Sequence, residues 1–194
     1  RRLIQKASQM LHCLIRAERD DPDRYAWLLA DQRGEITQPI GHGSLAEAAA
    51  KLTNCRVVLC LPSAHVLLTT LEIPGTQRAQ LQMAVPYALE EELAQDIEDI
   101  HFALGPRDTE RRLAVAAIAH VELARHLDAC QDMDMRIQAA TADVLLLPFT
   151  AGTWSILIEG EETLVRTGPA TGFACDSSDL ATYLAAHASE ALDG

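Results

Sequence analysis

Short apolar runs separated by turn-forming residues fill the first part of the chain. Leu11 to Ala17 and Tyr25 to Ala30 flank the polar stretch Arg19-Asp20-Asp21-Pro22-Asp23, a pattern that predicts a β-hairpin. Gly34 is predicted to start a third strand that ends at Gly41-His42-Gly43. This part of the chain therefore indicates a β-hairpin followed by a third strand.

A helix and two further strands are predicted next. Ser44, followed by Glu47 three residues later, forms a capping-box pattern ahead of an alanine-rich helix that runs to Leu52. The β-branched and leucine-rich runs Arg56 to Pro62 and Val66 to Pro74 follow, separated by three residues. From Leu11 to Pro62 the predicted order is strand, strand, strand, helix, strand.

The middle of the chain changes to a helical period. Apolar residues recur every four positions while acidic residues fill the other faces, so an amphipathic helix with an acidic flank is predicted. Pro86 lies inside this pattern, so the helix either kinks near Val85 or ends there and a second helix begins. We expect burial of Leu81, Val85, Leu89, Leu93 and Ile97, and exposure of Glu91, Asp96 and Glu98.

The charged turn Arg107 to Arg111 is predicted to join two strands, the second of them Leu113 to Ala119, and a helix is predicted from His120 to about Cys130. The last part of the chain repeats the opening order loosely. The predicted strands are Trp154 to Glu159, Thr163 to Arg166 and Thr171 to Cys175, followed by a helix from Ser178 to Glu190. This echo suggests duplicated subdomains.

Composition restricts the class of partner. With 194 residues, of which 48% are hydrophobic, the chain can bury a sizeable core. A net charge of -12 argues against nucleic acid and anionic membrane surfaces, because phosphate contacts need clustered Lys and Arg. A basic protein is the electrostatic complement, and acidity that serves solubility alone is the alternative. The five cysteines contain no C-x-x-C pair and predict buried thiols in a reducing compartment.

No loop in the sequence has the chemistry of a nucleotide site. The turn Asp20 to Asp23 has no glycine and three carboxylates, and Ala151 to Trp154 offers one glycine and no acidic residue for Mg²⁺. Gly41-His42-Gly43 precedes a helix, but two glycines without a lysine are a weak phosphate signal. We expect no cofactor and no small-molecule substrate.

Candidate catalytic and metal-binding residues are equally sparse. His120 and His126 are six residues apart, which excludes the i, i+4 pair of a helical zinc site. His101 is expected to bond to a nearby carboxylate. Glu90, Glu91 and Glu92 are adjacent on a helix and therefore diverge, so we expect a solvated face and not a catalytic pair. The sequence predicts a protein that is not an enzyme and holds no metal.

One segment carries a family resemblance. After the strand that ends at Ile73-Pro74-Gly75, the chain reads PYALEEELAQDIEDIHFAL from Pro86 to Leu104. This arrangement resembles the cytoplasmic domain of the type II secretion system L protein family (GspL), and the strong match runs from Val57 to Phe149. The resemblance implies an α/β (α+β) fold with actin-like, RNase H-like β-rich subdomains and a small inserted α/β subdomain.

The same resemblance implies a domain plan. Residues 1–75 would form a first β-rich subdomain to which residues 141–150 return. Residues 76–140 would form the small α/β subdomain that is the candidate docking region. Residues 151–194 would form a second β-rich subdomain, which the family plan makes incomplete.

The function implied by the resemblance is that of a non-enzymatic scaffold on the cytoplasmic side of the bacterial inner membrane, in a protein that crosses the membrane once. Its expected partners are the N-terminal domain of the secretion ATPase (GspE-like) and the M-, F- and C-type platform proteins, and a homodimer stays open. The alternative is a divergent actin-like ATP-binding protein, which the missing phosphate loops disfavour. The candidate partner-binding residues are Glu90, Glu91, Glu92, Asp96, Glu98 and Asp99.

Overall fold

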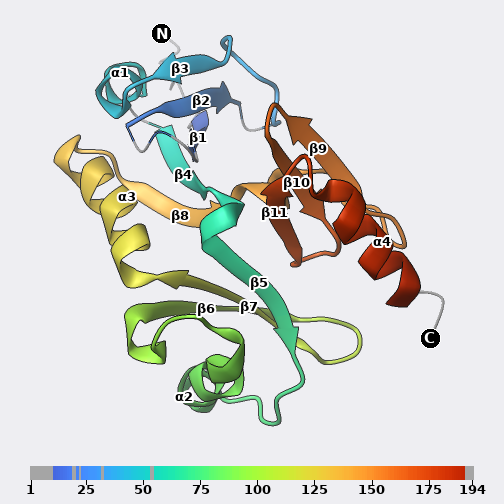
Figure 1. The fold of residues 1–194 in the computed structure, drawn as a ribbon. Helices are drawn as coiled ribbons and strands as arrows, with labels where there is room; N and C mark the ends of the chain where they lie inside the picture. Colours follow the sequence, from blue (N-terminus) through green and yellow to red (C-terminus); the bar gives the residue numbers. More distant parts are fainter. Residues whose placement is uncertain (1–10, 19–20, 22, 32, 53–54, 191–194) are drawn as a thin grey trace, which may run out of the picture. The chain divides into compact units, whose positions relative to one another are not determined.

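The computed structural model describes residues 11–18, 21, 23–31, 33–52 and 55–190. They form a mixed α/β fold (Figure 1), which confirms the predicted fold class. The chain divides into two compact units. The first comprises Arg1–Pro62 and Val121–Ala142, and the second comprises Ser63–His120 and Asp143–Gly194.

The first unit is built on a five-stranded sheet in the order β3-β2-β1-β4-β8. The strands are β1 (Leu11–Ala17), β2 (Tyr25–Ala30), β3 (Gly41–Gly43), β4 (Cys55–Leu61) and β8 (Ile137–Ala142). The predicted hairpin is confirmed, because β1 and β2 pair antiparallel. β4 pairs parallel with β1 and also with β8. The helices of this unit are α1 (Leu45–Lys51) and α3 (His120–Asp132).

The core of the first unit follows the alternation of β1. Cys13 and Ile15 are fully buried on one face of the strand, and Leu59 of β4 lies beside Ile15 in the parallel register. Both neighbours of β1 are strands, so its backbone groups are paired on each side. Side chains of β2 and β4 therefore flank those of β1 on the same face, and the inward-facing residues of β1 lose nearly all contact with water.

The predicted third strand is much shorter than expected. Only Gly41–Gly43 forms β3, and a single bridge joins Ala30 to Ile36 ahead of it. Pro39 interrupts the run and has no backbone N–H to donate to a ladder, which accounts for the gap. The glycine at position 41 is required sterically, because a Cβ there would lie 2.3 Å from the indole of Trp27.

The capping box at Ser44 is confirmed. The backbone N–H of Glu47 donates to the Ser44 hydroxyl, and the Glu47 carboxylate accepts from the Ser44 backbone N–H at 2.8 Å. These hydrogen bonds lower the pKa of Glu47 below its ordinary value. The start of α1 is thus fixed by two residues that are three positions apart, so it can be predicted from the local sequence alone.

The second unit contains two three-stranded antiparallel sheets. One has the order β5-β7-β6, with β5 at Val66–Leu71, β7 at Leu113–Ala119 and β6 at Ile100–Arg107, and α2 (Arg78–Leu89) packs on it (Figure 1). The other has the order β11-β10-β9, with β9 at Ser155–Glu159, β10 at Glu162–Arg166 and β11 at Gly172–Asp176, and α4 (Leu180–Glu190) follows it. The strands and the helix predicted for the last part of the chain are confirmed.

Three elements depart from the expected subdomain assignment. The run that became β5 was assigned with β4 to the first β-rich subdomain, whereas it pairs with β7. α3 was assigned to the small subdomain, whereas Val121–Ala142 belongs to the first unit. β8 was not expected as a strand at all, because its pairing with β4 joins residues about 80 positions apart and leaves no local signal. The boundaries at 75, 140 and 150 otherwise stay predictions.

A buried hydrogen-bonded clasp lies where two segments enter the second unit. Ser63, in a short 3-10 turn (η1, Ser63–His65), donates from its backbone N–H and its hydroxyl to one carboxylate oxygen of Asp143. The N–H of Val144, in another 3-10 turn (η4, Asp143–Leu146), donates back to the Ser63 hydroxyl at 3.0 Å. Ser63 and Asp143 are both buried, so the clasp satisfies polar groups that would otherwise be costly.

The thiols behave as predicted from their apolar surroundings. All five cysteines are free, and four of them are buried; Cys55 is half-buried. Burial raises the pKa of Cys130 to about 11 and also raises the pKa of Cys13 and Cys55. In the described part of the chain, no helix has the length and apolar character needed to span a membrane.

Candidate partner-docking site

The candidate residues begin at the end of α2. This helix buries Leu81, Val85 and Leu89 against Leu113 and Val115 of β7. The three helix residues follow one another at four-residue steps, so they share a face and insert into the sheet surface. The predicted burial of these three residues is confirmed. Their packing fixes the position of the C-terminal end of α2, from which the acidic segment begins.

The helix ends earlier than predicted. α2 stops at Leu89, and Glu90–Glu92 (η2) and Ile97–Asp99 (η3) form separate 3-10 turns. A strict four-residue spacing rotates by about 40° per step on a helix with about 100° per residue, so five such residues cannot share one face. Leu93 instead reaches the core from extended backbone and is half-buried, as is Ile97.

Pro86 neither ends α2 nor begins a second helix. It lies inside the helix, which continues to Leu89. The alternative in which one helix ends there and a second begins was therefore wrong. Val85 and Leu89, on either side of the proline, are both fully buried, and this packing outweighs the missing backbone donor.

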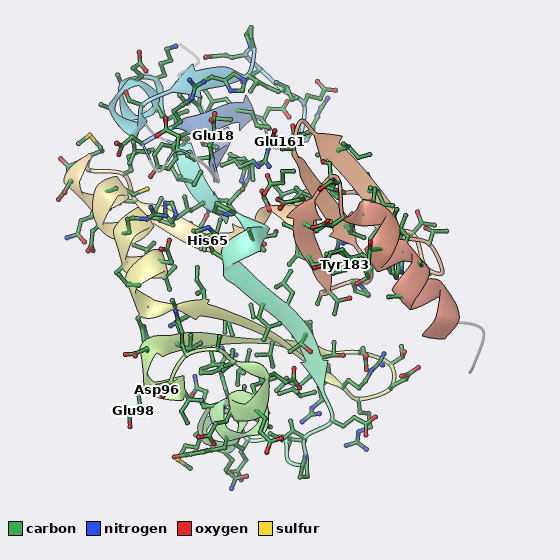
Figure 2. The ribbon with its side chains drawn as sticks, in the orientation of Figure 1. Glu18, His65, Asp96, Glu98, Glu161 and Tyr183 are labelled. Atoms are coloured by element: carbon green, nitrogen blue, oxygen red, sulfur yellow. The ribbon has the colours of Figure 1, made fainter. Side chains whose placement is uncertain are left out.

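All six candidate carboxylates lie on the surface of the second unit. Glu90, Glu91, Glu92, Asp96, Glu98 and Asp99 are exposed, which confirms the predicted exposure of three of them. Figure 2 labels Asp96 and Glu98, whose side chains point away from the ribbon. None of the six forms an ion pair with another described residue.

The end of α2 adds to this negative potential. The last turn of the helix contains no basic residue, and three glutamates follow directly. The carbonyl end of a helix carries a partial negative charge of roughly half an electron, so the carboxylates and the helix dipole repel each other. A cation from another molecule would relieve this repulsion.

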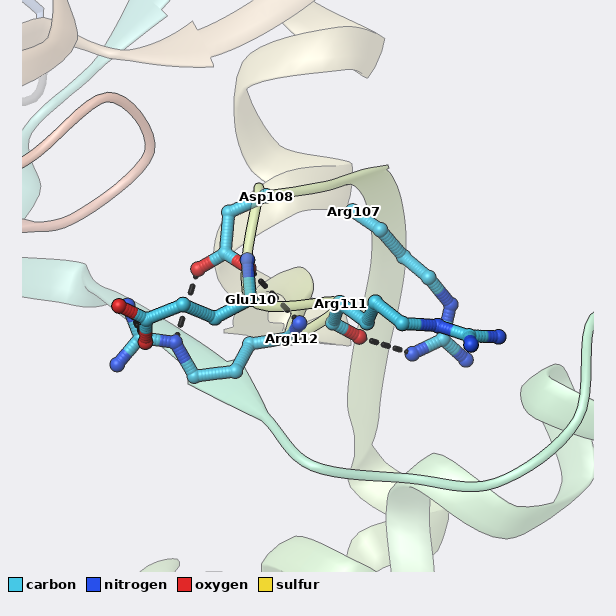
Figure 3. Close-up of polar contacts among 5 residues, drawn as sticks. All are labelled: Arg107, Asp108, Glu110, Arg111 and Arg112. Carbon is cyan, nitrogen blue, oxygen red and sulfur yellow. Dashed lines mark hydrogen bonds and ion pairs between the residues drawn. The ribbon is translucent and has the colours of Figure 1, made fainter.

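The hairpin between β6 and β7 is hydrogen-bonded internally and to the segment that precedes α2. Arg107 donates to the backbone carbonyls of Ile73 at 2.9 Å and Gly75 at 2.7 Å, which ties down the segment that leads into the helix. Asp108 accepts from the side chain and the backbone of Arg112, both at 2.8 Å (Figure 3). Burial alone would raise the pKa of Asp108, but these hydrogen bonds outweigh it and lower that pKa.

Two exposed apolar residues on α2 were missed by the sequence analysis. Met83 and Tyr87 are 69% and 70% exposed on the face opposite the buried stripe. The sequence contained a signal for them, because residues 79–89 include no charged side chain at all. A solvated helix face is normally rich in charge, so the absence of charge there indicates a second apolar face.

The described histidines make other contacts than those of a metal site. The rings of His101 and His120 lie edge to face with centroids 5.8 Å apart, in place of the carboxylate contact expected for His101. His126 is buried, and its Nδ1 lies 3.4 Å from the Tyr25 hydroxyl. Across the residues that the structure places, no group of three or more His, Cys, Asp or Glu side chains is arranged to hold a metal ion.

Two of the three loops weighed as phosphate sites are fully described, and neither of these two shows an amide cradle. Gly41–Gly43 is a paired strand, and the start of α1 behind it is occupied by the Glu47 carboxylate. The stretch at Ala151 is a turn closed by the Thr153 N–H on the carbonyl of Thr150. Asp20 and Pro22 of the first turn lie outside the described residues.

Comparison with known proteins places the chain in a family. Residues 13–192 match the family described as type II secretion system (T2SS), protein L. The chain is 31% identical over 163 residues to the type II secretion system protein L of Vibrio cholerae and 28% identical over 175 residues to that of Dickeya chrysanthemi. These matches cover 82% and 89% of this chain but 40% and 44% of those proteins, so the chain spans less than half their length.

Solved structures agree with this placement. The cytoplasmic domain of EpsL, an inner membrane component of the V. cholerae type II secretion system, matches with a TM-score of 0.78 and 26% identity over 89% of this chain and 74% of that domain. A protein of Bacteroides thetaiotaomicron with an actin-like ATPase fold matches with a TM-score of 0.55 and 9% identity over 96% of this chain and 78% of its own, which shows a shared fold alone. The chain therefore has an actin-like fold and belongs to the type II secretion system protein L family.

Proposed function

We propose that this chain is a docking domain on the cytoplasmic side of the inner membrane that recruits the secretion ATPase to the type II secretion platform. Family membership supports a role in secretion, and the solved EpsL domain, described as cytoplasmic and part of an inner membrane component, supports the location. We also propose the M-, F- and C-type platform proteins as partners, on the basis of family membership alone.

The observation that carries the proposal is the set of six exposed carboxylates without ion-pair partners in the described chain. Exposed acidic residues in a folded domain are commonly neutralised in part by neighbouring Lys or Arg. The six carboxylates instead follow the negative end of α2. Each contact with a basic partner surface would therefore be electrostatically favourable. The expected complement is a basic surface on the N-terminal domain of the ATPase.

A non-enzymatic role fits the loops of the chain better than ATP binding does. A nucleotide site needs backbone amides that face the phosphates and a carboxylate that positions Mg²⁺, and neither candidate loop in the described residues offers both. We expect thermal melting to be unchanged by Mg·ATP. A ligand present at a hundred times its Kd would stabilise the fold by about 2.7 kcal/mol, a shift that would establish the ATP-binding alternative.

The test of the docking surface is charge reversal. Glu91, Asp96 and Glu98 would be changed together to Lys, because an exposed ion pair contributes only about 0.2–1 kcal/mol and single changes would be too small to measure. We expect slower association with the secretion ATPase and a reversed dependence on salt, since steering of the encounter is electrostatic.

The matched control changes charge by the same amount elsewhere. Asp128, Asp132 and Glu161 are exposed acids on α3 and on the β9–β10 turn, and their replacement by Lys alters the net charge equally. Arg111 and Arg112 are unsuitable as a control, because Arg112 is paired with Asp108 and Glu110 in the hairpin. Equal effects from the two triple variants would reduce the proposal to net charge, and no effect from the first would move the interface away from this segment.

A further inference from the structure

α2 has two apolar faces but only one of them is covered. Leu81, Val85 and Leu89 fill the core, while Met83 and Tyr87 lie about 180° away, at roughly 100° per residue, and are about two-thirds exposed. A helix that is apolar all round is normally buried on all sides. The outer face of α2 is therefore an unpartnered helix surface.

The outer face has the spacing of a helix-packing stripe. Gln80, Met83, Ala84 and Tyr87 stand at i, i+3, i+4 and i+7, and all four are exposed. The short side chain of Ala84 between the two large ones allows a facing helix to approach closely. A tyrosine and a methionine together have the composition of an interface centre, where aromatic residues and Met are enriched.

Charge identifies what would cover this face. At its C-terminal end the stripe runs directly into Glu90, Glu91 and Glu92, none of which has an ion-pair partner among the described residues. If α2 of a second copy packed against this face, Arg78 would be the one basic residue that this helix brings, against six carboxylates, and the second copy would add a net charge of -12. Like charges on this scale oppose self-association, so a basic partner is favoured.

We propose that the outer face of α2 is the centre of the docking surface, and that its occupant is an amphipathic helix of the partner whose apolar stripe ends in Lys or Arg. Met83 and Tyr87 would pack against the apolar stripe, and Glu90–Glu92 would meet the basic end. Docking of an amphipathic helix on an apolar helix face is a common recognition mode. This inference rests on the proposed docking function and adds to the acidic segment the apolar contact that holds the complex together.

The two parts of the surface would act on different rates. Apolar contacts form after the encounter and slow dissociation, whereas exposed charges mainly speed association. Removal of the apolar centre should therefore raise the dissociation rate and leave the salt dependence unchanged. Charge reversal of the acidic segment should slow association and change its salt dependence, while the dissociation rate stays the same. These two results separate the role of the apolar centre from that of the acidic residues.

The experiment measures binding of the cognate secretion ATPase to the whole L protein by surface plasmon resonance. The double variant Met83→Gln/Tyr87→Gln keeps the helix and its charge while removing the apolar centre. Interface centres carry most of the binding free energy, so we expect affinity to fall at least about thirtyfold. The matched control is Val121→Gln/Tyr183→Gln, which removes an exposed aliphatic and an exposed tyrosine from α3 and α4 and should leave affinity within about twofold.

The outcomes separate this inference from the proposed function. If the wild-type protein binds the ATPase and the Met83→Gln/Tyr87→Gln variant binds equally well, the proposed function stands and the inference about α2 is wrong. If the wild-type protein does not bind the ATPase, the proposed function fails and the inference fails with it. If sedimentation velocity shows a dimer that the variant abolishes while ATPase binding is unchanged, the face is covered by a second copy and the inference is overturned.

Discussion

Two β-meanders in this chain have the same local order and different surroundings. β1-β2-β3 is followed by α1, and β9-β10-β11 is followed by α4. In the first, β1 lies between β2 and β4, and Ile15 is fully buried. In the second, β9 lies at the edge of its sheet, and Ile158 is 59% exposed. The same strand position is thus core in one case and surface in the other.

The difference shows that strand neighbours, and not apolar sequence alone, decide burial. β9 carries Ile156, Leu157 and Ile158 in succession, so apolar side chains point to both faces of the strand, and all three are exposed. The central strand β10 of the same sheet buries Leu164 and Val165. An edge strand with apolar residues on both faces is a surface on which other chains can pair.

The largest effect should come from truncation in the first meander. Ile15→Ala removes a fully buried side chain beside Leu59, so we expect it to lower the free energy of unfolding by about 2–5 kcal/mol. Trp27 lies in the same sheet and reports on this unit, and Trp154→Phe would remove the only other tryptophan signal. The matched change Ile158→Ala should cost less than about 1 kcal/mol, and equal losses would contradict the comparison.

A smaller loss of stability is expected from truncation in β10, the middle strand of the second meander, if the core of that sheet lies there. Val165→Ala removes two methyl groups from a fully buried side chain, so we expect a loss of about 1.5–2 kcal/mol at roughly 0.8 kcal/mol per group. Fluorescence of Trp154 under urea, with Trp27→Phe as background, would measure it. The comparison would weaken if Ile156→Ala on the edge strand cost as much.

The helix that follows the first meander should depend on its N-terminal cap. Ser44→Ala removes the capping box of α1 and should cost about 1 kcal/mol. Glu47 has a lowered pKa in the folded state, so its contribution is present above its unfolded pKa of about 4.3 and is lost as pH falls toward the folded value. The difference in urea midpoint between the wild type and Ser44→Ala should therefore shrink as pH is lowered through 4.

The smallest effect on stability should come from charge on the edge strand. Ile158→Lys places a charge on an exposed edge position and should change the free energy of unfolding by less than about 0.5 kcal/mol. Its expected effect is on association, because charged residues on edge strands oppose pairing between chains. Light scattering at high protein concentration should fall relative to the wild type, and a marked loss of stability would mean that β9 is covered.

The features that the sequence predicted correctly depend on neighbouring residues. The hairpin of β1 and β2, the capping box at Ser44 and the final three strands each follow from residues within a few positions of one another. The errors concern distant pairing, as with β8 against β4, or a local rule applied too far, as with the four-residue period beyond Leu89. The local pattern of apolar and polar residues does not specify which distant strand will pair with a given strand.

The candidate site divides in the same way. Exposure of Glu91, Asp96 and Glu98 was predictable from their charge, and it holds even though the helix assigned to them ends before they begin. The exposure of Met83 and Tyr87 was not predicted, because an apolar residue on a helix is ordinarily assigned to the core. The covered face of α2 was predicted from the spacing of Leu81, Val85 and Leu89, whereas its second apolar face was overlooked.

The pairing of β8 with β4 has a consequence for how the protein folds as it is made. When Leu61 has left the ribosome, β4 has β1 on one side, but its other neighbour lies some 75 residues further along the chain. The sheet β5-β7-β6 with α2 is complete once Ala119 has emerged, so the proposed docking surface should fold while the first unit still lacks its last strand. Nascent chains arrested at a length at which residue 120 has just emerged from the ribosome should therefore protect α2, but not β4, from proteolysis.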